Sequence, residues 1–221
     1  MTEQILLDND VVLKIACYSL VDEMLATTTS AGAAPGMLGV GRFVVRGRLE
    51  RDRRIADPSR AKAAFDRLLL QADLLEPSED ELAMAAELEA EAARLDLELD
   101  GGESQLVAML TSRGCRLLVT GDKRAIAAMA AVARSLVAGR VACLEQVIAQ
   151  LVASFGSAPV RSAICAESMA DRAVTLCFSC GRDADPGDAE VLAALASYSG
   201  HLNRAAPGIL LPGSDLSAAA R

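Results

Sequence analysis

The feature that most constrains the fold is a short apolar run that stops at a glycine and an aspartate. Residues 116–120 read RLLVT, and Gly121 and Asp122 follow directly. A run of this length that becomes β-branched towards its end is typical of a parallel strand buried on both faces. Open parallel sheets bind their ligands beyond the carboxyl ends of the strands, which is where Asp122 is expected.

Two further acidic residues stand at the ends of expected elements. Asp8 follows a first strand expected at residues 4–7 and precedes a helix expected over 11–26. Glu103 follows a glycine pair and opens a helix whose apolar residues recur at helical spacing, so it lies in a first turn. The positive end of that helix is expected to favour the ionised form of Glu103.

The rest of the chain alternates between strand and helix signals up to residue 156, after which strand signals fade. Beside the elements above, we expect a loop at 27–41, a helical or irregular stretch at 42–54, helices at 59–72 and 78–94, a link or edge strand at 74–77, a helix from 123, a strand at 141–143, and helices at 144–155, 160–180 and 189–204. This alternation predicts a three-layer α/β/α fold with a short parallel sheet. We expect this α/β domain to span residues 1–145 and a helical C-terminal extension to span 146–221.

Composition narrows the class of protein. The 221 residues are 52% apolar and can fill a core, and no apolar run approaches the ~18 residues of a membrane-spanning helix. The first ten residues are acidic and lead into a strand, which is unlike a secretory signal and favours the cytoplasm. Six scattered cysteines then indicate reduced, mostly buried thiols. A zinc site is the alternative for one group, namely Cys165, Cys177, Cys180 and His201.

Charge is distributed unevenly along the chain. The net charge of −8 argues against a protein that simply coats nucleic acid, yet six arginines fall between residues 42 and 54. That strip is either a phosphate-contacting surface or a solvated helix face. On the first interpretation, the residues expected to bind substrate are Arg42, Arg46, Arg48 and Lys123.

Together the acidic residues predict a metal site built from oxygen ligands. Asp8 and Asp122 follow strands and Glu103 opens a helix, while Asp100 and Glu50 are further candidates. Converging carboxylates repel one another unless their pKa values rise or a hard divalent cation neutralises them, which favours Mg²⁺ or Mn²⁺. Such an ion activates water and stabilises the charge on a phosphodiester. The single histidine leaves no imidazole pair for nuclease chemistry.

The order of three segments, ILLDND, LDGGESQLVAML and LLVTGDKRAI, resembles the PIN-domain family over about residues 4–145. The resemblance implies a PIN-like fold and a metal-dependent ribonuclease, as in toxin–antitoxin systems, that acts on RNA with Mg²⁺ or Mn²⁺. A homodimer and an inhibitory protein partner are the further partners that it implies. The catalytic metal ligands that it assigns are Asp8, Glu103 and Asp122, with Asp100 and Glu50 as further ligands.

Other interpretations stay open beside this one. The pair Asp8 and Asp10 after an apolar strand is also similar to the first motif of haloacid-dehalogenase-type phosphatases, which implies Asp8 as nucleophile and Asp10 as general acid. A PIN-like scaffold that no longer cleaves and serves as an interaction module is another. An aspartate after a strand is also more often a helix N-cap than a metal ligand, and Asp122 would cap a helix that begins at Lys123.

Overall fold

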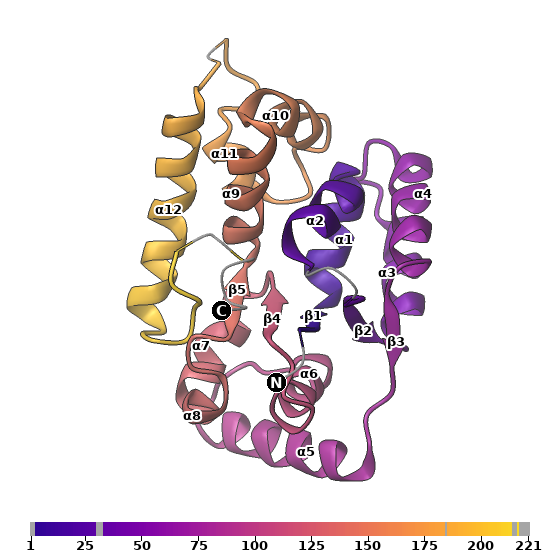
Figure 1. Ribbon diagram of the computed structural model, residues 1–221, viewed down its shortest axis with the longest axis vertical. Coiled ribbons are helices and arrows are strands. Elements are labelled where there is room, and N and C mark those ends of the chain that lie inside the picture. The colour runs from indigo at the N-terminus through magenta and orange to yellow at the C-terminus, as the bar shows by residue number, and fades with distance from the viewer. Residues whose placement is uncertain (1–2, 30–32, 184, 214–215, 217–221) are drawn as a thin grey trace.

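A five-stranded parallel sheet forms the centre of the molecule. The computed structural model describes residues 3–29, 33–183, 185–213 and 216 of the chain (Figure 1). The strand order is β3-β2-β1-β4-β5, and every pairing is parallel. The predicted α/β fold with a short parallel sheet is therefore confirmed. The strands are β1 Ile5–Leu7, β2 Gly36–Leu38, β3 Asp73–Leu75, β4 Leu117–Thr120 and β5 Val141–Cys143.

Helices connect the strands and continue beyond the last one. Most of them begin and end within a few residues of the positions that the sequence indicates. The described helices are α1 Asn9–Tyr18, α2 Val21–Thr28, α3 Gly41–Arg51, α4 Pro58–Leu69, α5 Glu79–Arg94, α6 Gly101–Ser112, α7 Lys123–Val132, α8 Arg134–Val137, α9 Leu144–Phe155, α10 Ser157–Ala166, α11 Arg172–Cys177 and α12 Asp188–Ala205.

The helices cover both faces of the sheet and produce the expected three layers. Successive strand side chains point to opposite faces, so Leu7 and Val119 enter one core while Leu6 and Leu118 enter the other. Helices α1 to α4 and α9 to α11 contribute to the first core, and α5 to α8 contribute to the second. Figure 1 shows α5, α6 and α8 below the strands and the first group above them.

The single helix expected over residues 11–26 is two helices. Ser19 has a φ of 56°, a left-handed conformation that ends α1 before α2 begins at Val21. Its backbone N–H donates to the carbonyl of Ala16 and closes the last turn of α1. The apolar spacing continues across this turn, which is why the sequence pattern conceals the break.

The stretch expected as a loop at 27–41 contains β2. Gly36 lies so close to the neighbouring strands that an added Cβ would meet Leu75 Cδ1 at 2.6 Å and Leu6 Cδ2 at 3.0 Å. A side chain here would displace the ends of two packed leucine side chains, so glycine favours the close strand packing, although glycines in a sequence signal a loop. Glycine thus predicts a loop from the sequence alone, whereas the contacts of Gly36 place it in a strand.

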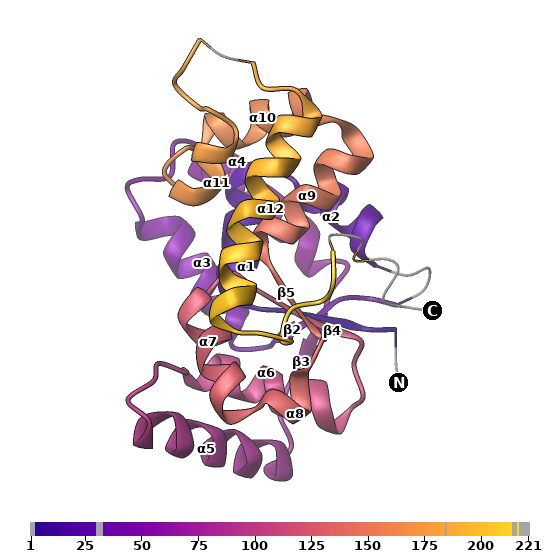
Figure 2. The same cartoon turned by 90° about the vertical axis from the view of Figure 1, so that its left-hand side faces the viewer.

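The C-terminal extension packs on the same core as the sheet. Residues of α10, α11 and α12 lie in the core that contains Ile5 of β1. Helix α12 runs beside α9 (Figure 2), and after α12 Leu210 forms an isolated parallel bridge with Val141 of β5. The helix expected over residues 160–180 is interrupted, because α10 and α11 are separate helices. Among the described helices, none has both the length and the apolarity needed to cross a membrane.

Two of the six cysteines form a disulfide, which corrects the expectation of reduced thiols throughout the chain. Cys165 in α10 and Cys180 after α11 are bonded across a sequence separation of 15 residues. The alternative zinc site with Cys177 and His201 loses two of its four ligands to this bond and is not formed. The remaining cysteines are free and buried, namely Cys17, Cys115, Cys143 and Cys177.

Reduction of the disulfide is expected to lower the thermal stability of the protein. A cross-link that closes a loop of about 15 residues stabilises the folded state by about 3 kcal/mol, mainly through the entropy of the unfolded chain. A dithiol reductant should lower the unfolding midpoint of the wild type and leave that of a Cys165→Ser, Cys180→Ser double variant unchanged, both followed by circular dichroism. Equal responses of the two proteins would contradict the bond.

Candidate functional site

The strand order reverses between β1 and β4, and this position defines the candidate site. The chain builds β2 and β3 on one side of β1 and then returns to place β4 and β5 on the other side. Asp8 follows β1 directly, and its backbone N–H donates to the Val119 carbonyl at 2.9 Å. Asp122 lies just after β4. Both aspartates are therefore beyond the carboxyl ends of the strands, in the crevice where doubly wound sheets bind ligands.

Each acidic group also holds the start of a helix. The Asp8 carboxylate accepts hydrogen bonds from the first two backbone N–H groups of α1 at 2.7 and 3.3 Å, and Asp122 caps α7 by accepting from the N–H groups of Arg124 and Ala125. At the start of α6, Asp100 accepts from the Glu103 N–H at 2.9 Å and Glu103 accepts from the Asp100 N–H at 3.2 Å. The N-cap interpretation of Asp122 is confirmed, and it extends to Asp8 and Asp100.

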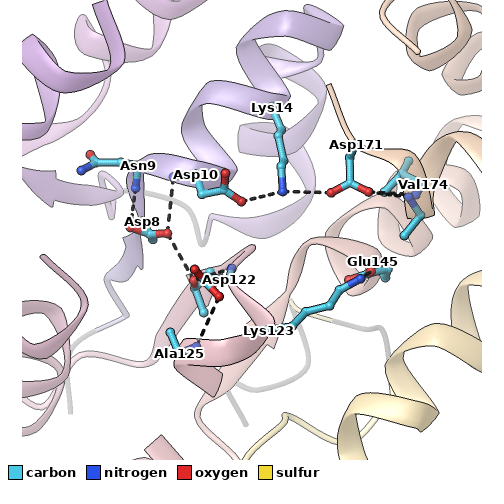
Figure 3. Close-up of polar contacts among 12 residues, drawn as sticks. Asp8, Asn9, Asp10, Lys14, Asp122, Lys123, Ala125, Glu145, Asp171 and Val174 are labelled. Atoms are coloured by element: carbon cyan, nitrogen blue, oxygen red, sulfur yellow. Dashed lines mark hydrogen bonds and ion pairs between the residues drawn. The ribbon is translucent and has the colours of Figure 1, made fainter. Parts of the chain in front are cut away.

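Thr120, the last residue of β4, joins the two strand ends. Its buried hydroxyl donates to Asp8 Oδ2 at 3.2 Å and accepts from the Asp122 N–H at 3.1 Å. Figure 3 shows Asp8 and Asp122 near each other at the ends of these neighbouring strands. The strand pattern of residues 116–120 predicts no role for this threonine in the site. Its position next to a glycine and an aspartate was the available signal.

Five carboxylates line one hollow of about 560 Å³ at this edge of the sheet, which we call the acidic hollow. Arg48 and Arg124 are cationic residues of the same lining, and Val40 and Val44 add an apolar wall. Another hollow of similar volume, between α9 and α12, has a mainly apolar lining, so it presents fewer groups that could act as acids, bases or metal ligands. The carboxylates of the acidic hollow belong to Asp8, Asp10, Asp100, Glu103 and Asp122.

Burial and repulsion raise two of these carboxyl pKa values. The pKa of Asp8 is raised to about 6 by burial and then by the charge of Asp10. Burial raises the pKa of Glu103 to about 8, together with the charges of Asp100, Asp8 and Asp122. Glu103 therefore holds its proton at neutral pH. The expectation that the helix end keeps Glu103 ionised is wrong, because desolvation and like charges outweigh the helix dipole.

Asp122 behaves in the opposite way. Burial raises its pKa, but hydrogen bonds from the backbone N–H groups of Arg124 and Ala125 and from the Arg124 side chain outweigh burial and hold the pKa below its ordinary value. Arg124 Nη2 lies 3.3 Å from Asp122 Oδ2. Arg124 was not predicted as a site residue from the sequence. The acidic hollow thus combines an ionised carboxylate with a protonated one, an arrangement suited to acid–base chemistry.

The donor set fits a hard divalent cation, although the side chains do not form a ready cage. Carboxylate oxygens are the ligands that Mg²⁺ and Mn²⁺ prefer, and neither histidine nor cysteine occurs in the described lining. A cation would also relieve the repulsion that acts on Asp8 and Glu103. Within the described part of the chain, however, no three such side chains lie close enough together to enclose an ion. Binding would therefore require carboxylates to rotate away from their helix starts.

One predicted metal ligand lies outside the acidic hollow. Glu50, on α3, faces Lys62 of α4 at 3.6 Å and is absent from the described lining. Asp10 is an additional carboxylate that the hollow does contain. Four of the five predicted ligands therefore meet there, and the acidic residue expected from the middle of the chain does not join them.

The residues expected to bind substrate are also only partly brought together. Arg48 lines the acidic hollow. Arg42 and Arg46 make their contacts on the outer surface of α3, where Arg42 lies over an exposed phenylalanine ring and Arg46 forms an ion pair. Lys123 turns away and forms an ion pair with the buried Glu145 at 2.5 Å. The arginine strip thus reaches the hollow at one residue.

Comparisons with known proteins add no assignment. No protein-family model matches the chain, and neither a curated protein nor a solved structure matches it. The PIN-domain resemblance therefore stays a prediction from sequence motifs.

Glu103→Gln is expected to flatten the pH dependence of stability. The raised pKa of Glu103 means that its proton stabilises the folded state, and this contribution is lost as the pH rises from the ordinary carboxyl pKa of 4.5 through about 8. Glutamine keeps an oxygen for the capping hydrogen bond without the charge. Without divalent cations, the free energy of unfolding of the variant should therefore exceed that of the wild type at pH 8 by at least about 1.4 kcal/mol, the equivalent of one pKa unit.

Urea unfolding in EDTA at acidic, neutral and mildly alkaline pH measures this difference. The advantage of the variant should disappear below the ordinary carboxyl pKa, where both proteins carry a neutral side chain. Glu87→Gln, on the exposed surface of α5, controls for the loss of one negative charge. Parallel pH profiles of wild type and Glu103→Gln would show that Glu103 is not protonated in the folded protein.

Proposed function

We propose that the chain is a divalent-metal-dependent nuclease that hydrolyses RNA phosphodiester bonds in the acidic hollow. One observation carries the proposal, namely that segments far apart in the sequence bring Asp8, Glu103 and Asp122 to the point where the strand order reverses. Asp8 and Glu103 are each only 6% exposed, so a cation that neutralises their charge would stabilise their ionised forms most.

In this proposal Asp8, Glu103 and Asp122 would hold Mg²⁺ or Mn²⁺ after their carboxylates rotate, with Asp100 beside Glu103 as a further ligand. The bound ion lowers the pKa of water and compensates charge on the phosphodiester. Glu103 would hold the ion as a carboxylate, since the ion would take the place of the proton as counter-charge. Arg48 at the wall of the hollow is placed to pair with a phosphate oxygen.

The surface next to the hollow supports a polyanionic substrate with apolar bases. Helix α3 presents the side chains of Arg42 and Arg46 to solvent, and Phe43 is 63% exposed beside them. Val44 of the same helix lines the acidic hollow. Arginines that contact phosphates beside aromatic rings that stack on bases are typical of surfaces that bind single-stranded nucleic acid.

The remaining parts of the prediction concern partners and location. A homodimer and an inhibitory protein partner are proposed from the PIN-domain resemblance alone. The cytoplasm is the proposed location, and the Cys165–Cys180 disulfide weighs against it, because disulfides persist mainly in oxidising compartments.

A non-catalytic interaction module is the second candidate. It is favoured by the capping roles of the carboxylates, which by themselves explain why Asp8, Asp100 and Asp122 stand where they do. The phosphatase interpretation has less support. Its general acid would be Asp10, whose carboxylate lies 2.6 Å from the ammonium group of Lys14.

The nuclease proposal predicts metal-dependent RNA cleavage that is lost in Asp122→Asn. Asparagine still caps α7, because its side-chain oxygen accepts the same backbone hydrogen bonds, but it is a neutral and weaker ligand. Cleavage of a mixed RNA pool with Mn²⁺ or Mg²⁺, followed by gel electrophoresis, should slow by at least about a hundredfold. EDTA should abolish cleavage by the wild type.

The control for Asp122→Asn is Asp57→Asn. Asp57 caps α4 by accepting from the Arg60 N–H at 2.9 Å and is not in the described lining of the acidic hollow. This variant should cleave RNA at the rate of the wild type. A phosphomonoester is assayed in parallel. Turnover of the monoester without RNA cleavage would contradict the proposal, and inactivity towards both would favour the interaction module.

A further inference from the structure

A partly buried lysine connects the acidic hollow to the C-terminal extension. Lys14 projects from α1, and its ammonium group lies 2.6 Å from Asp10 Oδ2 and 2.9 Å from Asp171 Oδ2. The side chains of Lys14 and Asp171 are each only 14% exposed. Figure 3 shows the three side chains in a row, with Lys14 in the middle. Asp10 lines the acidic hollow, whereas Asp171 belongs to the extension.

Asp171 is held firmly where it meets Lys14. Its other carboxylate oxygen caps α11 by accepting from the N–H groups of Ala173 and Val174 at 2.9 and 3.0 Å. Nearby, the buried Glu167 accepts two backbone hydrogen bonds, at 2.8 and 2.7 Å, from the segment between α3 and α4. The extension is thus joined to the sheet-bearing part of the chain through Glu167 as well as through Asp171, and the cap of α11 orients the Asp171 carboxylate.

The other end of the row packs against the turn that carries Asp122. A Cβ added to Gly121 would meet Asp10 Oδ2, and it would lie 3.3 Å from Lys14 Nζ. The ion pair therefore lies directly against the backbone between Thr120 and Asp122. A side chain at this position would push the ends of Asp10 and Lys14 aside, so the turn, Asp10 and Lys14 pack together at the edge of the acidic hollow.

We propose that Lys14 is a positioning residue that sets the affinity of the acidic hollow for divalent cations, because it holds the Asp10 carboxylate and is itself held by Asp171. The inference rests on the proposed function in that the hollow binds such a cation. Asp10 is engaged by Lys14 and is thereby kept from becoming a further ligand. The C-terminal extension, through Asp171, takes up part of the lysine charge that would otherwise oppose a cation.

The two charges on this row predict opposite effects on cation binding. Loss of the Lys14 ammonium removes a positive charge beside the hollow and leaves Asp10 with the more distant Arg48 guanidinium, 3.9 Å away, so Asp10 becomes more available as an oxygen ligand and affinity increases. Loss of the Asp171 charge leaves the full field of Lys14 acting on the hollow, so affinity decreases. A purely structural role for both residues would weaken binding in both variants, because each would loosen the fold.

Isothermal titration with Mn²⁺ at low ionic strength tests these signs on the full chain. Lys14→Met should lower the Kd for Mn²⁺ about tenfold, and Asp171→Asn should raise it about threefold. Asparagine keeps the cap of α11, so this second variant changes charge and little else. In an Asp10→Asn background, Lys14→Met should tighten binding by less, because only the loss of the lysine charge then remains.

Matched controls come from exposed ion pairs on α4. Lys62→Met and Asp66→Asn make the same charge changes away from the acidic hollow and should shift the Kd less than about twofold. Absence of Mn²⁺ binding by the wild type would overturn both this inference and the metal site of the proposed function. Binding by the wild type with shifts of equal sign, or no shift, in the two variants would overturn the role of Lys14 alone. If Lys14→Met does not fold, unchanged affinity in Asp171→Asn overturns it.

Discussion

The parallel pairing of β1 with β4 is the constraint on which the rest of the structure depends. Leu6 stands opposite Leu118 in this pair, and the side chains of both strands alternate between two separate cores. The register is fixed, because a shift by one residue would exchange the contents of those cores. The residues that leave the two strands must therefore emerge together. Asp8 and Asp122 become neighbours for this reason, and the Thr120 hydroxyl joins them.

Helix starts at this edge of the sheet create a competition between two electrostatic effects. The positive ends of α1, α6 and α7 each favour a carboxylate, but several carboxylates in one buried hollow repel one another. This repulsion is reduced by the raised pKa of Glu103, which favours its protonated form, and by two ion pairs. Lys14 pairs with Asp10, and Arg124 pairs with Asp122. The proton on Glu103 and these two cationic side chains lower the repulsion among the carboxylates of the acidic hollow.

The sequence indicates local features of this arrangement and conceals the ones that depend on packing. Strand β4 and the capping box of α5 are recognised from a few adjacent residues, since their signals are local. β2 is not recognised from the sequence, because Gly36 contacts Leu75 and Leu6 on other strands and these contacts leave no local signal. The protonation of Glu103 and the contact between Lys14 and Asp171 arise only when distant segments are buried together, and no spacing along the chain announces them.

The bridge between Leu210 and β5 protects the edge of the sheet. β5 ends the strand order, so one of its sides lacks a neighbouring strand among those described. The Val141 N–H donates to the Ile209 carbonyl at 3.3 Å, and the Val141 carbonyl accepts from the Leu211 N–H at 2.7 Å. Open edges are templates on which another chain adds a strand and aggregation begins. The segment after α12 thus occupies the backbone groups that would otherwise let copies of this protein join sheet to sheet.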